Sequence, residues 1–448
     1  MTIFIYTLLI ILYIVSRFFT DLFFSYCIGI LALVTLLLSL FRAKGLYLIS
    51  GICFLAIGIL LFLTGDHPWY AFLLHFESML GVLSLFLVLP FINSIIRVGR
   101  YDINLGLLLK NEVDRLSKLY KRSFLVTHFL GLFLNIATLP LLKKSLDRTL
   151  SQLPKIMADR YYTQNILRSY ALCLTWSPME VMVSTSIDLT NKGYYQVFPI
   201  AFSIAIITIL SDWLLSYFKY RNVSLVIENS SEISYKKVYR KIVEMLFMLF
   251  LFIVSVSLLQ KGIDRGFLFA VVLLIIPISI VWALYIRKIR RYFSITIPHW
   301  KERTKGLSNY FFMFLSAGLF VEMLSLSGHL TFLQSAFRSI TDQSFVFYLM
   351  VGGYFLFTSF IGFHPLVSLT LLAELLKPIL PEVSTISFTI VLISCSLATV
   401  MFSPFNLSVS ILSDELKINP YRLGLWNIVF AIFYMLLSIF IAFSLNSI

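Results

Sequence analysis

Long apolar runs, separated by short polar or basic segments, dominate the hydrophobic pattern of this chain. Most of the runs reach the ~20 residues that a helix needs to cross a bilayer. The pattern therefore predicts an all-α polytopic membrane protein. The predicted spans number eleven and cover residues 2–16, 22–41, 46–64, 69–96, 169–190, 195–217, 242–260, 266–286, 309–326, 384–412 and 423–445.

Two further apolar runs do not fit a simple crossing. The run 124–142 has basic segments on both sides, so both of its ends should lie on the same face of the membrane. We predict that it enters and returns as a re-entrant hairpin. The run 344–378 is interrupted by Gly362-Phe363-His364-Pro365 and is predicted to be a second hairpin from the opposite face. The basic segment 97–122 is predicted to be an amphipathic helix on the inner surface.

Two of the predicted spans contain a break at mid-membrane depth. Ser177-Pro178-Met179-Glu180 interrupts 169–190, and Ser403-Pro404-Phe405-Asn406 interrupts 384–412. Proline removes a backbone donor and clashes with the preceding turn, so each helix must kink or stop there. Irregular backbone at this depth is tolerated only inside protein or beside a wet cavity. Paired interruptions in two halves point to the binding site of a secondary transporter.

The two halves of the chain align with nearly constant spacing. Pro365 follows Pro140 by 225 residues, Ser403 follows Ser177 by 226, and Tyr421 follows Tyr194 by 227. The number of spans between the halves places them in opposite orientations, which predicts an inverted repeat. The predicted units are a first repeat at 1–218, a cytoplasmic connector at 219–241 and a second repeat at 242–448.

Composition and charge refine this picture. Hydrophobic residues make up 59% of the 448 residues and charged residues 13%, against roughly 25% charged in soluble domains. The net charge is +14, but 30 of the 36 Lys and Arg residues fall on one predicted face. The positive-inside rule makes that face cytoplasmic, so the charge does not indicate a nucleic-acid partner. The remaining six basic residues are Arg17, Lys192, Lys261, Arg265, Arg338 and Lys377.

This topology places the N-terminus in the cytoplasm and the C-terminus outside, in a multi-pass protein of a cell membrane such as a bacterial inner membrane. The first residues show no basic n-region or cleavage site, so no signal peptide is expected. The cysteines lie inside apolar runs without a C-x-x-C pair and are interpreted as small core residues, with no disulfide, metal site or cofactor expected. They are Cys27, Cys53, Cys173 and Cys395.

With a hairpin, a broken helix and a closing span in this order twice, the chain resembles the divalent anion/sodium symporter family and, more broadly, the ion transporter superfamily. In that family the hairpin tips carry Ser-Asn-Thr and the broken helices a Thr-Pro-Pro-Asn-like turn. Here Asn135 remains at the first tip, and Asn406 follows the second Ser-Pro. Gly362-Phe363-His364 replaces the second tip, and Glu180 stands in place of the first break asparagine.

The resemblance implies partners, a transport mechanism and separate roles for two parts of the chain. The partners would be a small carboxylate-type anion and a second copy of the chain. The mechanism would be elevator-like, with residues 1–122 and 242–326 as the scaffold. Residues 123–218 and 344–448 would form the mobile transport unit.

Six side chains are candidates for binding substrate or ion, and five of them have a structural alternative. Ser177 and Ser403 offer hydroxyls beside free carbonyls, or they only satisfy the carbonyls that a proline kink leaves free. Glu180 is a proton carrier or cation ligand, since intramembrane acids are functional candidates by default, or it is a structural carboxylate. His364 titrates near neutral pH or simply packs. Asn135 coordinates an ion through its amide oxygen or hydrogen-bonds a neighbouring helix, and Asn406 is a candidate contact for the anion.

The coupling ion is left open between H⁺ and Na⁺. The family's sodium sites use neutral oxygens, several of which this chain has replaced, so Glu180 favours H⁺; alternatively Glu180 binds Na⁺ directly. The helix-breaking residues are Pro140, Pro178, Pro365 and Pro404. Glu77, Asp212 and Glu322 lie outside the broken segments and are interpreted as structural or as supporting residues behind the site.

Two other classes of protein compete with a transporter. An intramembrane enzyme of envelope polysaccharide or lipid assembly would need a sizeable loop with clustered His, Arg and Asp. The exterior segment 327–343 offers only His329, Arg338 and Asp342, and no triad, metal-ligand or phosphate-loop spacing is present. A structural or assembly protein would not need symmetric breaks. We therefore expect a secondary transporter and not an enzyme.

Overall fold

The computed structural model describes residues 2–19, 21–65, 68–109, 113–225, 235–263, 265–383 and 385–446. In these ranges all regular structure is helical, apart from one isolated bridge between Arg115 and Ser224. Eleven helical segments of the described chain are long and apolar enough to cross a membrane. The prediction of an all-α polytopic membrane protein is therefore confirmed.

The eleven long segments are not the same eleven that the sequence predicts. The segment Thr2–Ser16 is helical but short, and the span predicted at 169–190 is divided by its break. Their places in the count are taken by Leu116–Leu150 and Ser344–Ile361, which belong to the predicted hairpins. The difference arises because length and hydropathy alone cannot distinguish a hairpin arm from a crossing.

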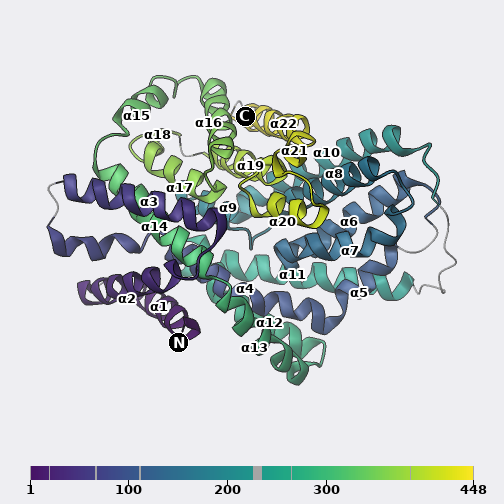
Figure 1. Ribbon diagram of the computed structural model, residues 1–448, viewed down its shortest axis with the longest axis horizontal. Coiled ribbons are helices and arrows are strands. Elements are labelled where there is room, and N and C mark those ends of the chain that lie inside the picture. The colour runs from purple at the N-terminus through teal and green to yellow at the C-terminus, as the bar shows by residue number, and fades with distance from the viewer. Residues whose placement is uncertain are drawn as a thin grey trace.

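One group of helices comes from the start of each half. α3 packs on α14, α4 packs on α12 and α13, and α1 packs on α2 (Figure 1). The first half contributes α1 (Thr2–Ser16), α2 (Leu22–Leu40), α3 (Gly45–Thr64), η1 (Trp69–Phe76), α4 (Leu80–Gly99), α5 (Tyr101–Gly106) and η2 (Leu107–Leu109). The second contributes α11 (Tyr235–Ile263), α12 (Phe267–Tyr285), α13 (Ile289–Lys305), α14 (Ser308–Leu326) and α15 (Thr331–Arg338).

One prediction about the basic segments is wrong. The single amphipathic helix predicted at 97–122 does not form, because Arg100 adopts a left-handed conformation (φ 57°) that ends α4. Tyr101 then turns inward and accepts a hydrogen bond from the Trp282 indole at 2.8 Å. A second basic segment, between the spans predicted at 266–286 and 309–326, forms α13, which packs on α4.

The region of the predicted first hairpin forms two helices that turn back on each other and pack on a third. Ser123 on α6 bonds to Tyr161 on α8 at 2.8 Å, and the next residue, Tyr162, donates to Asp147 on α7, also at 2.8 Å. The end of α7 therefore returns to the level at which α6 begins, with the turn at Asn135 between them. The elements are α6 (Leu116–Leu134), η3 (Asn135–Ala137), α7 (Thr138–Leu150), α8 (Lys155–Leu174), α9 (Val181–Thr190) and α10 (Tyr194–Tyr220).

The second half repeats this arrangement. α16 runs alongside α19, with Phe347 against Phe388 near one end and the Ser403 hydroxyl on the Ser359 carbonyl at the other. α17 folds back on α16 after a turn at Gly362 (φ 115°). The elements are α16 (Ser344–Ile361), α17 (Pro365–Leu376), α18 (Leu380–Val383), α19 (Ile386–Phe402), α20 (Leu407–Leu416), α21 (Pro420–Leu425) and α22 (Ile428–Leu445).

The two broken helices run in opposite directions. Thr190, at the end of α9, bonds to Thr389, at the start of α19, at 2.8 Å. At the other end, the Asn427 amide donates to the carbonyls of Thr163 on α8 and Met401 on α19, each at 3.2 Å. The start of α8 thus lies beside the end of α19. This antiparallel packing is the geometry that an inverted repeat requires.

Arg168, which directly precedes the span predicted at 169–190, is part of a buried polar network. Arg168 lies within α8, is buried, and pairs with Asp212 on α10 at 2.6 Å. Tyr120 on α6 donates to the same carboxylate at 2.8 Å, and the Arg168 Nε donates to Asn427 at 2.9 Å. Neutralisation by Asp212 allows the arginine inside the bundle. Asp212 is therefore structural, as the sequence analysis interprets it.

A close backbone approach at the second break gives a first testable prediction. A Cβ on Gly424 would lie 2.2 Å from the Phe402 carbonyl oxygen, and backbone cannot yield as a flexible side chain can. We expect Gly424→Ala to destabilise the protein by about 1–3 kcal/mol, the usual cost of overpacking. Gly353→Ala is the control, because a Cβ there meets nothing within 4 Å. Thermal melting of the purified protein in detergent measures both, and equal melting temperatures would contradict the close approach.

The antiparallel packing gives a second prediction. Cysteines replacing Thr190 and Thr389 should be joined by mercuric ion, because the two hydroxyls are 2.8 Å apart. With a protease site inserted at 226–234, the linked halves should stay together on a denaturing gel after cleavage. The control pair, at Thr190 and Ser413, places the second cysteine on α20, beyond the other end of α19. Linkage of the control pair but not of the first pair would refute the opposite orientation.

Candidate functional site

Both hairpin turns and both helix breaks meet at one cavity of about 180 Å³. Asn135 reaches it from the first hairpin and His364 from the second. Glu180 and Asn406 reach it from the two breaks. The opposite wall comes from α4 and from the segment joining α13 to α14. The cavity therefore lies between the group of helices that begins each half and the group that ends it.

Each break is closed by the same local device. The Ser184 hydroxyl donates to the Pro178 carbonyl at 3.5 Å, and the Ser410 hydroxyl donates to the Pro404 carbonyl at 3.2 Å. In both cases the serine lies six residues after the proline, and the serines are 226 residues apart. A carbonyl that the broken helix leaves free is thus satisfied without water, as membrane depth requires. The sequence analysis did not single out these serines.

Glu180 and Asn406 occupy equivalent positions at the N-termini of α9 and α20. The Asn406 side chain caps its helix by accepting from the Ser408 N–H at 3.0 Å. Glu180 makes no such capping bond, although its carboxylate lies beside the N–H groups of Val181 and Met182. A helix N-terminus favours a negative charge. One break therefore carries a neutral amide, and the other carries an ionisable acid.

The two hairpin turns are also equivalent, but not in the register that the prolines suggest. Asn135 (φ 49°) ends α6, and Gly362 (φ 115°) ends α16, so these two residues correspond. The proline spacing instead sets Asn135 opposite Phe360. The shift arises because Pro140 is the third residue of α7, whereas Pro365 is the first residue of α17. The Asn135 side-chain oxygen Oδ1 accepts a hydrogen bond from the Tyr170 hydroxyl on α8.

His364 caps α17 with its imidazole. The Nδ1 atom accepts from the Leu366 N–H at 3.3 Å, so the ring hydrogen resides on Nε2 when the imidazole is neutral. The ring also packs edge-on against Phe314, with 5.4 Å between centroids. His364 therefore lines the cavity with its ring fixed in position. Its Nε2–H is available to donate to a ligand, because no described residue accepts from it.

Ser177 and Ser403 lie in the breaks but do not line the cavity. Ser403 donates to the Ser359 carbonyl at 2.9 Å and so ties the second break to the second hairpin. Pro178 and Pro404 lie within the breaks, whereas Pro140 and Pro365 lie in the first turn of α7 and α17. Four of the six candidate binding residues thus meet at the cavity, and the two serines lie behind it.

The wall that faces the hairpin turns and the breaks contains polar residues that could not be predicted from the sequence. Arg303, near the end of α13, lines the cavity and accompanies Tyr310 from α14. The guanidinium has no carboxylate partner among the described residues, and its Nε is 3.4 Å from the His299 imidazole. Arg303 belongs to a strongly basic segment, so the sequence offered no signal to separate it from its neighbours. Tyr170 also lines the cavity, but it lies inside an apolar run, so the sequence did not distinguish it from the core residues around it.

The donor set of the cavity suits an anion. Guanidinium, imidazole N–H and the carboxamides of Asn93, Asn135 and Asn406 are hydrogen-bond donors, and the N-termini of α17 and α20 lie at the same place. Glu180 is the single carboxylate among the described lining residues. No group of three or more His, Cys, Asp or Glu side chains in the described chain is placed to hold a metal ion.

Comparison with known proteins gives a match at the level of fold. No protein-family model and no curated protein sequence matches the chain. Among solved structures, the crystal structure of the Alcanivorax borkumensis YdaH transporter, described as having an unusual topology, is similar with a TM-score of 0.53. The match covers 90% of this chain and 98% of that one at 11% sequence identity. The likeness spans both halves and establishes the shared fold alone.

Proposed function

We propose that this protein is a secondary active transporter that moves a small carboxylate-type anion across the membrane. The observation that carries the proposal is the meeting of both hairpin turns and both helix breaks at one cavity. Irregular backbone at membrane depth is costly, so its concentration around one space favours a binding site. The fold shared with the YdaH transporter supports the proposal.

The substrate class follows from the donors. Arg303 supplies a fixed positive charge on the scaffold wall, and His364 with the Asn135 and Asn406 amides supplies neutral donors on the opposite wall. A guanidinium binds carboxylate in bidentate fashion and more strongly than neutral donors do. The cavity of about 180 Å³ limits the substrate to a small molecule.

Glu180 is the proposed coupling residue. When ionised, it would repel an anionic substrate in the same cavity, so the substrate would bind together with a proton or a cation. We favour H⁺, since Glu180 lacks an ion-pair partner among the described residues and is buried. The alternative is Na⁺ held by the Glu180 carboxylate with neighbouring carbonyl oxygens.

We further propose an elevator-like movement between the two helix groups. Several hydrogen bonds cross the boundary between the two groups. The Ser325 hydroxyl on α14 donates to Glu374 on α17 at 3.0 Å, and the Thr370 hydroxyl on α17 lies 3.9 Å from the Met79 sulfur, next to α4. Links of this kind would break and re-form as the hairpins and broken helices slide past the scaffold.

The coupling proposal is tested in proteoliposomes with a panel of radiolabelled mono- and dicarboxylates. Under an imposed pH gradient, Glu180→Gln should abolish accumulation, because glutamine cannot gain and lose a proton. Glu415→Gln removes the same charge from an exposed position on α20 and should leave accumulation unchanged. Accumulation driven by sodium at equal pH, and unaffected by Glu180→Gln, would show the proton assignment to be wrong.

The movement is tested with cysteines at Met79 and Thr370 in a chain otherwise free of cysteine. A short bifunctional thiol reagent should link them and stop uptake, because the scaffold and the hairpin unit would then be tied. Reduction should restore uptake if the reagent joins them through disulfides. Each single-cysteine variant, treated alike, is the control. Full uptake with complete linkage would contradict the elevator-like movement.

A further inference from the structure

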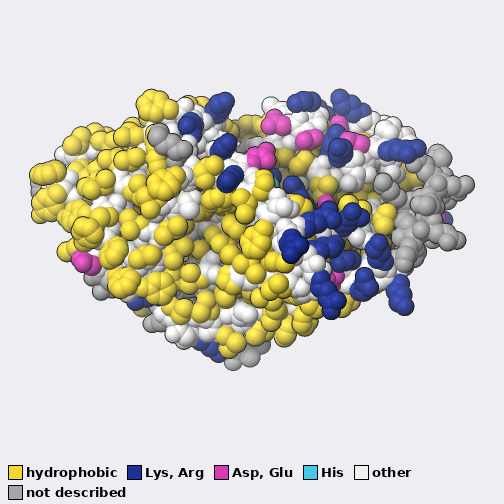
Figure 2. Space-filling model, turned by 90° about the horizontal axis from the view of Figure 1, so that it is seen from below, with side chains coloured by type: hydrophobic (Ala, Val, Ile, Leu, Met, Phe, Trp, Pro, Cys, Tyr) yellow, Lys and Arg dark blue, Asp and Glu magenta, His cyan; other side chains and the backbone are white. Residues whose placement is uncertain are grey.

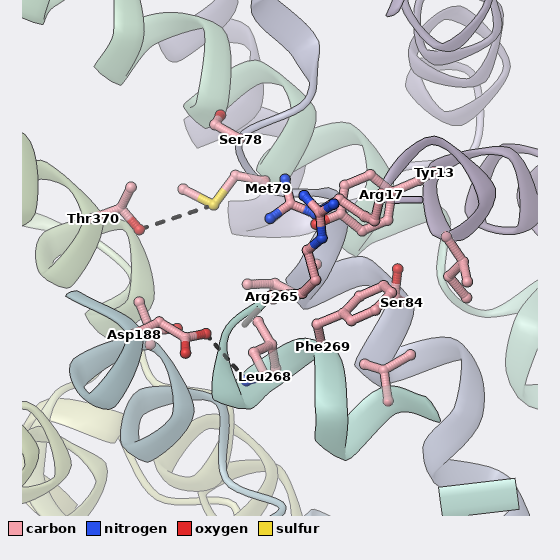
Figure 3. Close-up of a pocket in the computed structure, with 15 residues that line it drawn as sticks. Tyr13, Arg17, Ser78, Met79, Ser84, Asp188, Arg265, Leu268, Phe269 and Thr370 are labelled. Carbon is pink, nitrogen blue, oxygen red and sulfur yellow. Dashed lines mark hydrogen bonds between the residues drawn. The ribbon is translucent and has the colours of Figure 1, made fainter. Parts of the chain in front are cut away.

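A second polar cavity, distinct from the central one, has a volume of about 220 Å³. Its lining includes Arg17 from the end of α1 and Arg265 from the residue pair that precedes α12. In Figure 3 both arginine side chains reach into the cavity beside Met79 and Tyr13. An adjoining cavity of about 640 Å³ shares Arg17 and Arg265 and adds Lys192 and Lys261.

This cluster contains four of the six basic residues on the predicted exterior face. Lysine and arginine residues are rare on this predicted face, which holds six of the 36. In Figure 2 most of the basic side chains in view lie in the right half, and the left half is mainly hydrophobic. The other two members are already paired: Arg338 with Glu382 at 3.8 Å, and Lys377 with Glu374 at 3.3 Å. The other four basic residues have no ion-pair partner among the described residues, and they lie together around the two cavities. This grouping requires an explanation.

One acidic residue accompanies the four cations among the described residues that line the two cavities. Asp188, on α9, accepts from the Phe267 N–H and from the Leu268 N–H, the latter at 3.1 Å, and so caps α12. Figure 3 shows its carboxylate turned toward Leu268. In the described chain neither Arg17 nor Arg265 has a carboxylate within ion-pair distance. The described residues that line the cavities therefore carry a formal charge of +3, that is, 4 − 1.

The basic cavity continues the central cavity along the same boundary. α9 lines the central cavity with Met182 and the basic cavity with Thr185, three residues on. α17 lines them with Leu366 and Thr370, four residues apart. At a rise of about 1.5 Å per residue, these nearest lining residues of the two cavities are about one helical turn, or about 5 Å, apart along each helix. α4 contributes to both walls as well.

We propose that Arg17 and Arg265 form an outer binding site for a small carboxylate- or phosphate-bearing anion, one helical turn from the central cavity. Two guanidinium groups facing one space bind such an anion through charge-assisted, bidentate hydrogen bonds. Lys192 and Lys261 raise the local anion concentration at its mouth. This inference rests on the proposed function only for the further step, in which the bound anion passes to the central cavity.

The site is tested by binding to the full-length protein in detergent. Citrate and inorganic phosphate are the probes, and the readout is melting temperature against chloride at equal ionic strength. Arg17→Gln with Arg265→Gln should raise the apparent dissociation constant by about tenfold or more, since each lost charge-assisted hydrogen bond is worth ~1.5–3 kcal/mol. Arg338→Gln with Lys377→Gln removes equal charge from the same face outside the cavities and should change nothing.

Two comparisons locate the effect. The variant pair Arg17→Lys and Arg265→Lys keeps the charge and should retain part of the binding, which separates loss of the site from loss of folding. Arg303→Gln should leave the outer binding component intact. Unchanged affinity in the glutamine pair, or an equal loss in the Arg338 and Lys377 control, would overturn the outer site.

A lipid headgroup offers the same phosphate chemistry as a free anion. Adding phosphatidylglycerol to the micelles, with phosphatidylcholine as the control, separates the two sources. Displacement of citrate by phosphatidylglycerol alone would show that the site holds a lipid and would overturn its place on the substrate path. In reconstituted vesicles the glutamine pair should raise KM and leave kcat unchanged. Binding without uptake by any variant would refute transport while leaving the outer site standing.

Discussion

The structure depends on one constraint: backbone that leaves a helix at membrane depth must be enclosed by protein. The broken segment Ile386–Leu416 has 94% of the residues of its most apolar window buried, whereas the plain span Gly45–Thr64 has 22%. The other elements are arranged around this difference. The hairpins cover the breaks, α10 and α22 cover the outer flanks of the broken helices, and the remaining helices close the open side (Figure 1). A cavity remains only where the two groups of helices meet.

Enclosing the breaks requires that the broken helices be fixed to the helices around them. Arg168 does this by joining α8 to α10 through Asp212 and to the start of α22 through Asn427. Removing either partner of a buried ion pair typically costs ~3–5 kcal/mol, because the other charge is then left unpaired. The Asn427 amide continues the connection to backbone carbonyls on α8 and α19. The network therefore holds together the ends of the two broken helices without occupying the cavity between their breaks.

The sequence predicted the irregular parts of this fold better than its charged parts. Proline and glycine act on the backbone locally, so the breaks and turns could be located, and with them Asn135, Glu180, His364 and Asn406, which the structure brings to one cavity. Arg168 and Arg303 could not be placed, because a charge near the end of an apolar run indicates a loop unless its partner is known. Asp212, the partner of Arg168, is 44 residues away along the chain. The roles of the four cavity residues in binding remain predictions.

The difference between the two breaks carries the functional argument furthest. An inverted repeat supplies two equivalent positions, and an equivalent pair would treat both sides of the membrane alike. Here one position holds Asn406, whose amide is committed to capping α20, and the other holds Glu180, which leaves its capping role unfilled. A neutral cap and an ionisable acid at matched positions make the cavity chemically asymmetric within a symmetric backbone. In the proposed coupling, the group whose charge changes is a single residue, Glu180, because the residue at the matched position, Asn406, is neutral.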